Sequence, residues 1–60
     1  MYSMQIPTEA RVNAISGILT AQNIKHTVTL VSDDQYGKLY EMELAVEHRK
    51  ALQAAMKATA

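Results

Sequence analysis

Two β-prone segments joined by a short turn-forming sequence constrain the fold of this chain more than any other feature. Residues 26–32 (HTVTLVS) are rich in β-branched types, and residues 38–46 (KLYEMELAV) alternate apolar and polar side chains. The intervening residues 33–37 (DDQYG) are typical of a hairpin loop, in which Gly37 can adopt a positive φ. The sequence therefore predicts an antiparallel β-hairpin.

The register of this hairpin follows from matching the apolar faces of its two strands, because directly opposed side chains share a face of the sheet. The predicted pairs are Leu30 with Tyr40 and Val28 with Met42 on the inward face, and Thr29 with Glu41 and Val31 with Leu39 on the outer face.

A strand and a helix precede the hairpin, and a second helix follows it. Apolar and polar residues alternate in residues 2–6, and Pro7 ends this strand because proline cannot donate to a sheet ladder. Thr8 is the predicted N-cap of a helix that runs from Glu9 to about Asn23, and a second helix is expected at about residues 47–58. The predicted apolar stripes are Val12, Ile15, Ile18 and Leu19 in the first helix, and Leu52, Ala55 and Met56 in the second.

The order of these elements predicts one α+β domain spanning residues 1–60, with the topology β-α-β-β-α. A right-handed crossover makes the first two strands parallel to each other. We place the third strand between them, antiparallel to both, because it is the longest and has the most apolar inward face. The predicted fold is a three-stranded mixed sheet of order 2-3-1, with both helices on one face and two unprotected strand edges.

Composition limits the classes of partner. The chain has six Lys or Arg and six Asp or Glu residues, so its formal net charge is zero, which argues against binding to nucleic acid or anionic lipid by bulk charge. No apolar run approaches the roughly 20 residues that span a bilayer, and the first residues lack a secretory signal pattern. Without cysteine the chain has no disulfide or thiolate metal site. We expect a cytoplasmic protein.

The small size of the core predicts self-association. The chain has 60 residues and neither Phe nor Trp, so its interior depends on aliphatic side chains, Met and a few Tyr. A chain of this length buries only about 60% of the surface that it exposes when unfolded. Contact with a second copy would add buried apolar area, and we therefore expect a homo-oligomer.

A stripe of small residues on the first helix is the first candidate contact surface. Its members are Ala10, Ala14, Gly17 and Ala21. Gly17 in mid-helix costs roughly 1 kcal/mol relative to alanine, which suggests that another backbone approaches closely there. The alternative is a stripe of ordinary exposed alanines.

Nothing in the sequence predicts catalysis, a cofactor or a metal. Two glycines are too few for a phosphate-binding loop, and His26 and His48 lack a metal-ligand spacing. The acidic residues Glu41, Glu43 and Glu47 alternate as they would on a solvated sheet face, and we prefer this interpretation to a divalent-cation site.

The start of the last helix has an unfavourable charge pattern, because cations are destabilising near a helix N-terminus. One hypothesis is that a phosphate, a nucleotide or a partner carboxylate binds there. The candidate anion-binding residues are His48, Arg49 and Lys50, joined by Arg11 if the first helix faces a neighbouring chain. The alternative is that Glu43 and Glu47 neutralise the cluster and that it only keeps the surface soluble.

The hairpin tip is the second candidate contact surface. Tyr is enriched at protein interfaces, and Tyr36 lies at the predicted tip beside acidic residues. The predicted partner-facing residues are Tyr36, Asp33, Asp34, Val31 and Leu39.

These patterns favour a small, non-catalytic, homo-oligomeric binding protein that acts as an inhibitor or adaptor of a macromolecular partner. Its size and organisation are similar to those of small accessory proteins made by bacteriophages. Two alternatives stay open: an oligomer that sequesters an anionic small ligand such as a nucleotide, and a non-catalytic subunit of a larger enzyme assembly.

Overall fold

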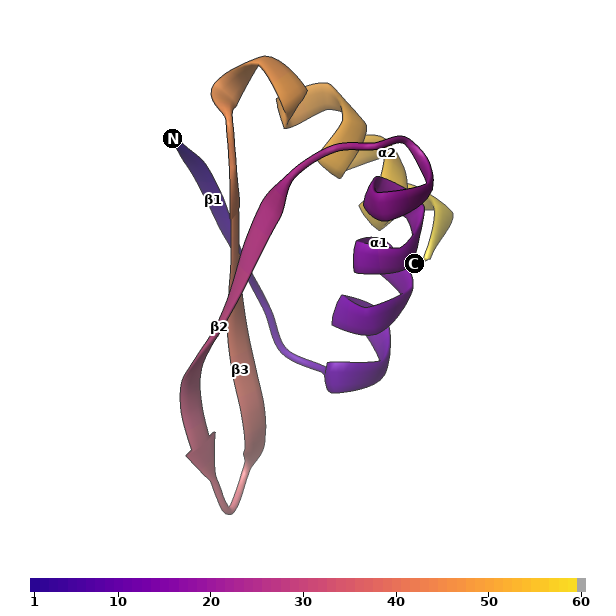
Figure 1. The fold of residues 1–60 in the computed structure, drawn as a ribbon. Helices are drawn as coiled ribbons and strands as arrows, with labels where there is room; N and C mark the ends of the chain where they lie inside the picture. The colour runs from indigo at the N-terminus through magenta and orange to yellow at the C-terminus, as the bar shows by residue number, and fades with distance from the viewer. Residues whose placement is uncertain (60) are drawn as a thin grey trace.

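The computed structural model describes residues 1–59, which form a three-stranded sheet with two α-helices on one face (Figure 1). The elements are β1 (Tyr2–Ile6), α1 (Glu9–Ala21), β2 (His26–Asp34), β3 (Gly37–Leu44), the 3-10 helix η1 (Val46–His48) and α2 (Arg49–Ala58). The predicted α+β class is confirmed.

The sheet has the order β1-β3-β2, and both of its ladders are antiparallel. The central, antiparallel placement of β3 is as predicted, but the description of the sheet as mixed is wrong, because β1 and β2 run in the same direction without pairing with each other. β3 is also not the longest strand, since it has eight residues and β2 has nine. Its central position brings its apolar face under α1.

Helix α1 begins and ends with recognisable local signals. Thr8 is the extended residue before the helix, as predicted, although its side chain makes no capping hydrogen bond. The helix ends at Ala21, two residues before the predicted boundary. Asn23 has a φ of 60°, its N–H donates to the carbonyl of Thr20 at 2.9 Å, and the Ile24 N–H donates to the carbonyl of Leu19 at 2.9 Å. This pair of bonds is a Schellman motif, and it turns the chain towards β2.

One cluster of apolar side chains lies between the sheet and the helices. The buried residues are Ile6, Val12, Ile15, Leu19, Met42, Leu44, Leu52 and Ala55. The predicted stripe of α1 supplies three of them, while Ile18 is only partly buried. Helix α1 packs against β3 and β1, and α2 packs against α1.

The hairpin register is as predicted up to Leu30 and then shifts. Leu30 pairs with Tyr40, and the two preceding predicted pairs are also present. A bulge at Val31 then breaks the ladder, so that Ser32 rather than Val31 lies opposite Leu39. The predicted contact between Val31 and Leu39 across the strands is therefore wrong.

The turn of the hairpin is tighter than the predicted five-residue loop. Asp33 and Asp34 belong to β2, and only Gln35 and Tyr36 lie between the strands. The Tyr36 N–H donates to Oδ1 of Asp34 at 2.8 Å, which is the usual role of aspartate in a turn. Gly37 has the expected positive φ, at 118°.

The C-terminal segment differs from the single helix predicted for residues 47–58. β3 ends at Leu44, and a 3-10 turn follows before α2 begins at Arg49. Only two residues of α2 are buried, Leu52 and Ala55. Among residues 1–59 no helix is long and apolar enough to cross a membrane.

Candidate functional site

The most unusual surface of the molecule is β2, which the helices leave uncovered. None of its nine residues is buried. Val28 and Leu30 face the same side of the sheet as the buried Met42, yet they are 39% and 48% exposed. Helix α1 packs against β3 and β1 rather than β2, and in Figure 1 the hairpin tip extends beyond α1. The sequence predicted the correct face for these two side chains, but no helix covers them there.

The polar flank of α1 faces the start of β2. The Ser16 hydroxyl lies 2.7 Å from Nε2 of His26, and Nδ1 of His26 lies 3.0 Å from the carbonyl of Ile24. A carbonyl only accepts, so Nδ1 carries the proton and Nε2 accepts from Ser16. At the other end of α1, Nζ of Lys38 lies 3.8 Å from Glu9. The Ser16–His26 bond therefore holds the start of β2 against α1, while the Lys38–Glu9 pair joins α1 to β3.

The free edge of β2 has a distinct charge pattern. Its only neighbour in the described sheet is β3, so the outer row of its backbone N–H and C=O groups has no strand partner within residues 1–59. Residues 26–32 contain no Lys, Arg, Asp or Glu. Lys25 precedes them, and Asp33 and Asp34 follow them. The edge is therefore neutral in its middle, basic at one end and acidic at the other.

The predicted partner-facing residues extend this surface towards the hairpin tip. Tyr36 is 87% exposed and Val31, at the bulge, is 49% exposed. Asp33 and Asp34 are exposed, whereas Leu39 is half-buried in β3. The structure thus brings these residues together along one hairpin.

The opposite edge of the sheet is a weaker candidate. β1 has only five residues and is followed by Pro7. Its inward residues Tyr2 and Met4 pack against the core cluster. The edge of β1 therefore offers fewer backbone groups and no comparable uncovered apolar face.

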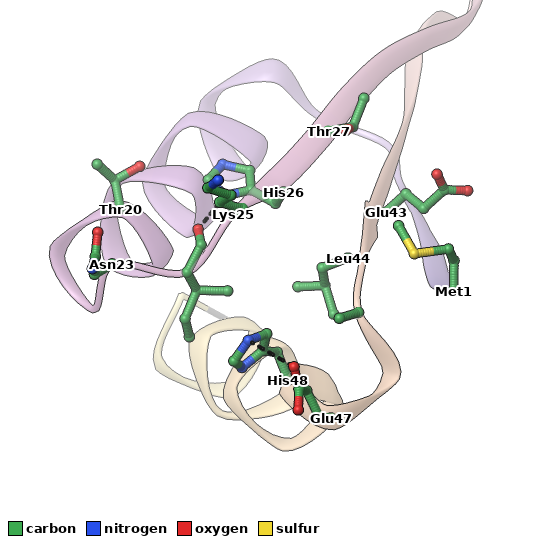
Figure 2. A pocket seen from close by; sticks show the side chains of 12 residues that line it. Met1, Thr20, Asn23, Lys25, His26, Thr27, Glu43, Leu44, Glu47 and His48 are labelled. Carbon is green, nitrogen blue, oxygen red and sulfur yellow. Dashed lines mark hydrogen bonds and ion pairs between the residues drawn. The ribbon is translucent and has the colours of Figure 1, made fainter.

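A pocket of about 850 Å³ lies where the end of α1, the start of β2 and the end of β3 meet. Figure 2 shows Lys25 and His26 on one side of this pocket, and His48 and Glu47 on η1. Nε2 of His48 lies 3.8 Å from Glu47. The other lining residues are Met1, Thr20, Asn23, Ile24, Thr27, Glu43, Leu44 and Ala45. The sequence identified His48 but missed Lys25, because only tertiary folding brings the two together.

The remaining predicted anion-binding residues lie elsewhere. Arg49 and Lys50 are exposed and do not line the pocket. Nη2 of Arg11 donates to the carbonyl of Met56 at 3.3 Å, while its Nε is buried without a partner in the described chain. Met56 is seven residues beyond Arg49, about 10 Å along the helix axis. The structure therefore does not bring Arg11 to the start of α2.

The small-residue stripe of α1 is exposed at all four positions, Ala10, Ala14, Gly17 and Ala21. A Cβ atom added at Gly17 would meet nothing within 4 Å. No described segment of this chain therefore makes the close backbone approach that the stripe suggested.

No group of three or more His, Cys, Asp or Glu residues within positions 1–59 is arranged to hold a metal ion. The chain matches no family model, and no curated protein or solved structure is significantly similar to it. Function has to be argued from the surfaces alone.

Proposed function

We propose that this chain is a non-catalytic, cytoplasmic binding protein that associates with itself and acts on a macromolecular partner as an inhibitor or adaptor. The observation that carries the proposal is the uncovered β2 strand. A nine-residue edge strand with exposed apolar side chains is the kind of surface that pairs with another chain.

The energetic argument concerns the apolar side chains of β2. Complete burial of a Val or Leu side chain contributes about 1.5–3 kcal/mol. Val28 and Leu30 are between one third and one half exposed, so covering them would recover roughly 1 kcal/mol each. Pairing of the free backbone edge would add hydrogen bonds to this gain. Because the core formed by residues 1–59 has only eight buried residues, such an addition is a large share of the total stability.

Two measurements test the proposal. Sedimentation equilibrium over a wide range of chain concentrations should show an oligomer, and a rigid, heat-resistant monomer at every concentration would contradict it. Immobilised protein should then retain one dominant protein partner. Tyr36→Ala, at the exposed hairpin tip, should weaken that retention without changing the oligomeric state. Thr20→Ala, on the other side of the molecule from the tip, is the matched control.

The pocket favours a second candidate function, the sequestration of a small anionic ligand such as a nucleotide. Its volume is within the range of about 300–1,000 Å³ that is usual for ligand sites. Lys25 supplies a positive charge and His48 does so when protonated, while Glu43 and Glu47 oppose an anion. A set of nucleotides and inorganic phosphate should raise the melting temperature if this function is correct. Lys25→Ala should abolish the rise, and Lys57→Ala, outside the pocket, should preserve it.

A further inference from the structure

The geometry points to β2 as the interface between two copies of this chain, which pair antiparallel about a two-fold axis and join their sheets into one of six strands. This inference rests on the proposed self-association and states where it occurs. The β2 edge of one copy therefore pairs with the β2 edge of a second copy.

Symmetry restricts how two identical β2 strands can pair. A two-fold axis normal to the sheet reverses the strand direction and keeps each face on its own side, which gives an antiparallel, closed pair. The inward side chains of one copy then lie beside the inward side chains of the other. Val28 and Leu30 of the two copies form one continuous apolar surface, with both α1 helices on the same side of the joined sheet.

Charge complementarity selects the antiparallel arrangement. The basic end of β2 carries Lys25, and its acidic end carries Asp33 and Asp34. Antiparallel pairing places the basic end of each copy beside the acidic end of the other, twice in every pair of chains. Parallel pairing would place like charges together. The neutral residues 26–32 let the middle of the strand pair without repulsion.

The bulge fixes the register. Leu30 and Ser32 lie opposite Tyr40 and Leu39, which are adjacent in β3. Val31 is therefore an extra residue and is not counted when the residues of two β2 strands are matched. With the axis at Thr29, an antiparallel pair brings together the following residues of the two copies: Thr29 with Thr29, Val28 with Leu30, Thr27 with Ser32, His26 with Asp33, and Lys25 with Asp34. In this register each apolar or charged residue meets a complementary residue on its own face of the sheet.

Single cysteines test this register, because the natural chain contains none. Directly opposed residues of antiparallel strands have Cα atoms about 4.5–5.5 Å apart, which is within the range that a disulfide bridges. Thr29→Cys should therefore form a disulfide-linked dimer rapidly with oxidised glutathione. Thr27→Cys is the matched control on the same exposed face, because its two copies would lie about 13 Å apart. Ser3→Cys tests the β1 edge.

Rapid cross-linking of Thr29→Cys alone, read on a non-reducing gel and lost in denaturant, supports the inference. Cross-linking of Thr29→Cys no faster than that of Thr27→Cys or Ser3→Cys overturns it. If sedimentation still shows a dimer in that case, self-association survives and only its location is wrong. If the natural chain is monomeric at every concentration, the proposed self-association fails as well.

A charge variant gives an independent measurement without a covalent bond. Lys25→Glu places one negative charge beside each of the two acidic ends in the pair and should raise the dimer dissociation constant roughly tenfold, since two symmetric ion pairs become repulsive. Lys57→Glu on α2 makes the same charge change away from β2 and should leave the constant unchanged. Equal effects of the two variants would contradict the register.

Discussion

Gly17 offers a test of whether the small-residue face of α1 is free or occupied. Glycine in an exposed helix interior costs about 1 kcal/mol relative to alanine. An added Cβ at Gly17 meets nothing within 4 Å, so no clash offsets this gain. Gly17→Ala should therefore raise the free energy of unfolding by about 1 kcal/mol. For a domain of this size the melting temperature should rise by roughly 4–8 °C.

Gly37→Ala is the matched control, because it makes the same chemical change where the backbone opposes it. Gly37 has a φ of 118°, a conformation that an L side chain rarely adopts. A Cβ atom added at Gly37 would also meet nothing within 4 Å. Backbone strain alone should therefore lower the free energy of unfolding, by about 1–3 kcal/mol. The two variants should therefore differ by roughly 2–4 kcal/mol.

The assay is urea unfolding followed by far-ultraviolet circular dichroism, at one low and one high chain concentration, with all variants compared at the same concentration. A gain for Gly17→Ala at low and high concentration confirms that the face is free. A loss that grows with concentration would refute the reasoning. It would show that a second backbone packs on the stripe of Ala10, Ala14 and Ala21.

Three further predictions concern the core and its polar neighbours. Leu52→Ala should lower the free energy of unfolding in urea by about 2–5 kcal/mol, since Leu52 is fully buried and anchors α2. As a control, Gln53→Ala at the next, exposed position should change it by less than about 0.5 kcal/mol. Ser16→Ala should lower the unfolding free energy by about 0.5–1.5 kcal/mol through loss of the bond to His26, and a larger hydrogen-exchange rate at the start of β2 should accompany it. Arg11→Met should raise the melting temperature, because removal of the buried Nε, which has no partner within residues 1–59, should outweigh loss of the long Nη2 bond to the Met56 carbonyl, with a net gain of up to about 1 kcal/mol. An unchanged or lower melting temperature would contradict this.

Local periodicity was sufficient to predict the elements and most of the hairpin register. The alternation of β3 and the helical spacing of α1 each reflect which side of an element is apolar, and both assignments are confirmed. Periodicity does not reveal whether another element covers that side. Val28 and Leu30 have the pattern of core residues, and they are exposed because α1 lies over β1 and β3 instead.

The irregular positions depend on tertiary contacts that a single sequence does not encode locally. No glycine or proline marks the bulge at Val31, so its register shift had no sequence signal. The end of α1 did have a sequence signal, because Asn is among the few residues that adopt a positive φ, as Asn23 does. Lys25 and His48 line the same pocket although 23 positions separate them in the sequence, and only the folded chain shows this.

The brevity of β1 has a consequence for how far the sheet can grow. When two copies join through β2, the only strands left at the ends of the extended sheet are the two β1 strands. Each has five residues, leads directly into Pro7, and has its inward side chains packed beneath a helix. Short edges of this kind are poor templates for further strands. Assembly should therefore stop at a closed pair rather than continue into a filament.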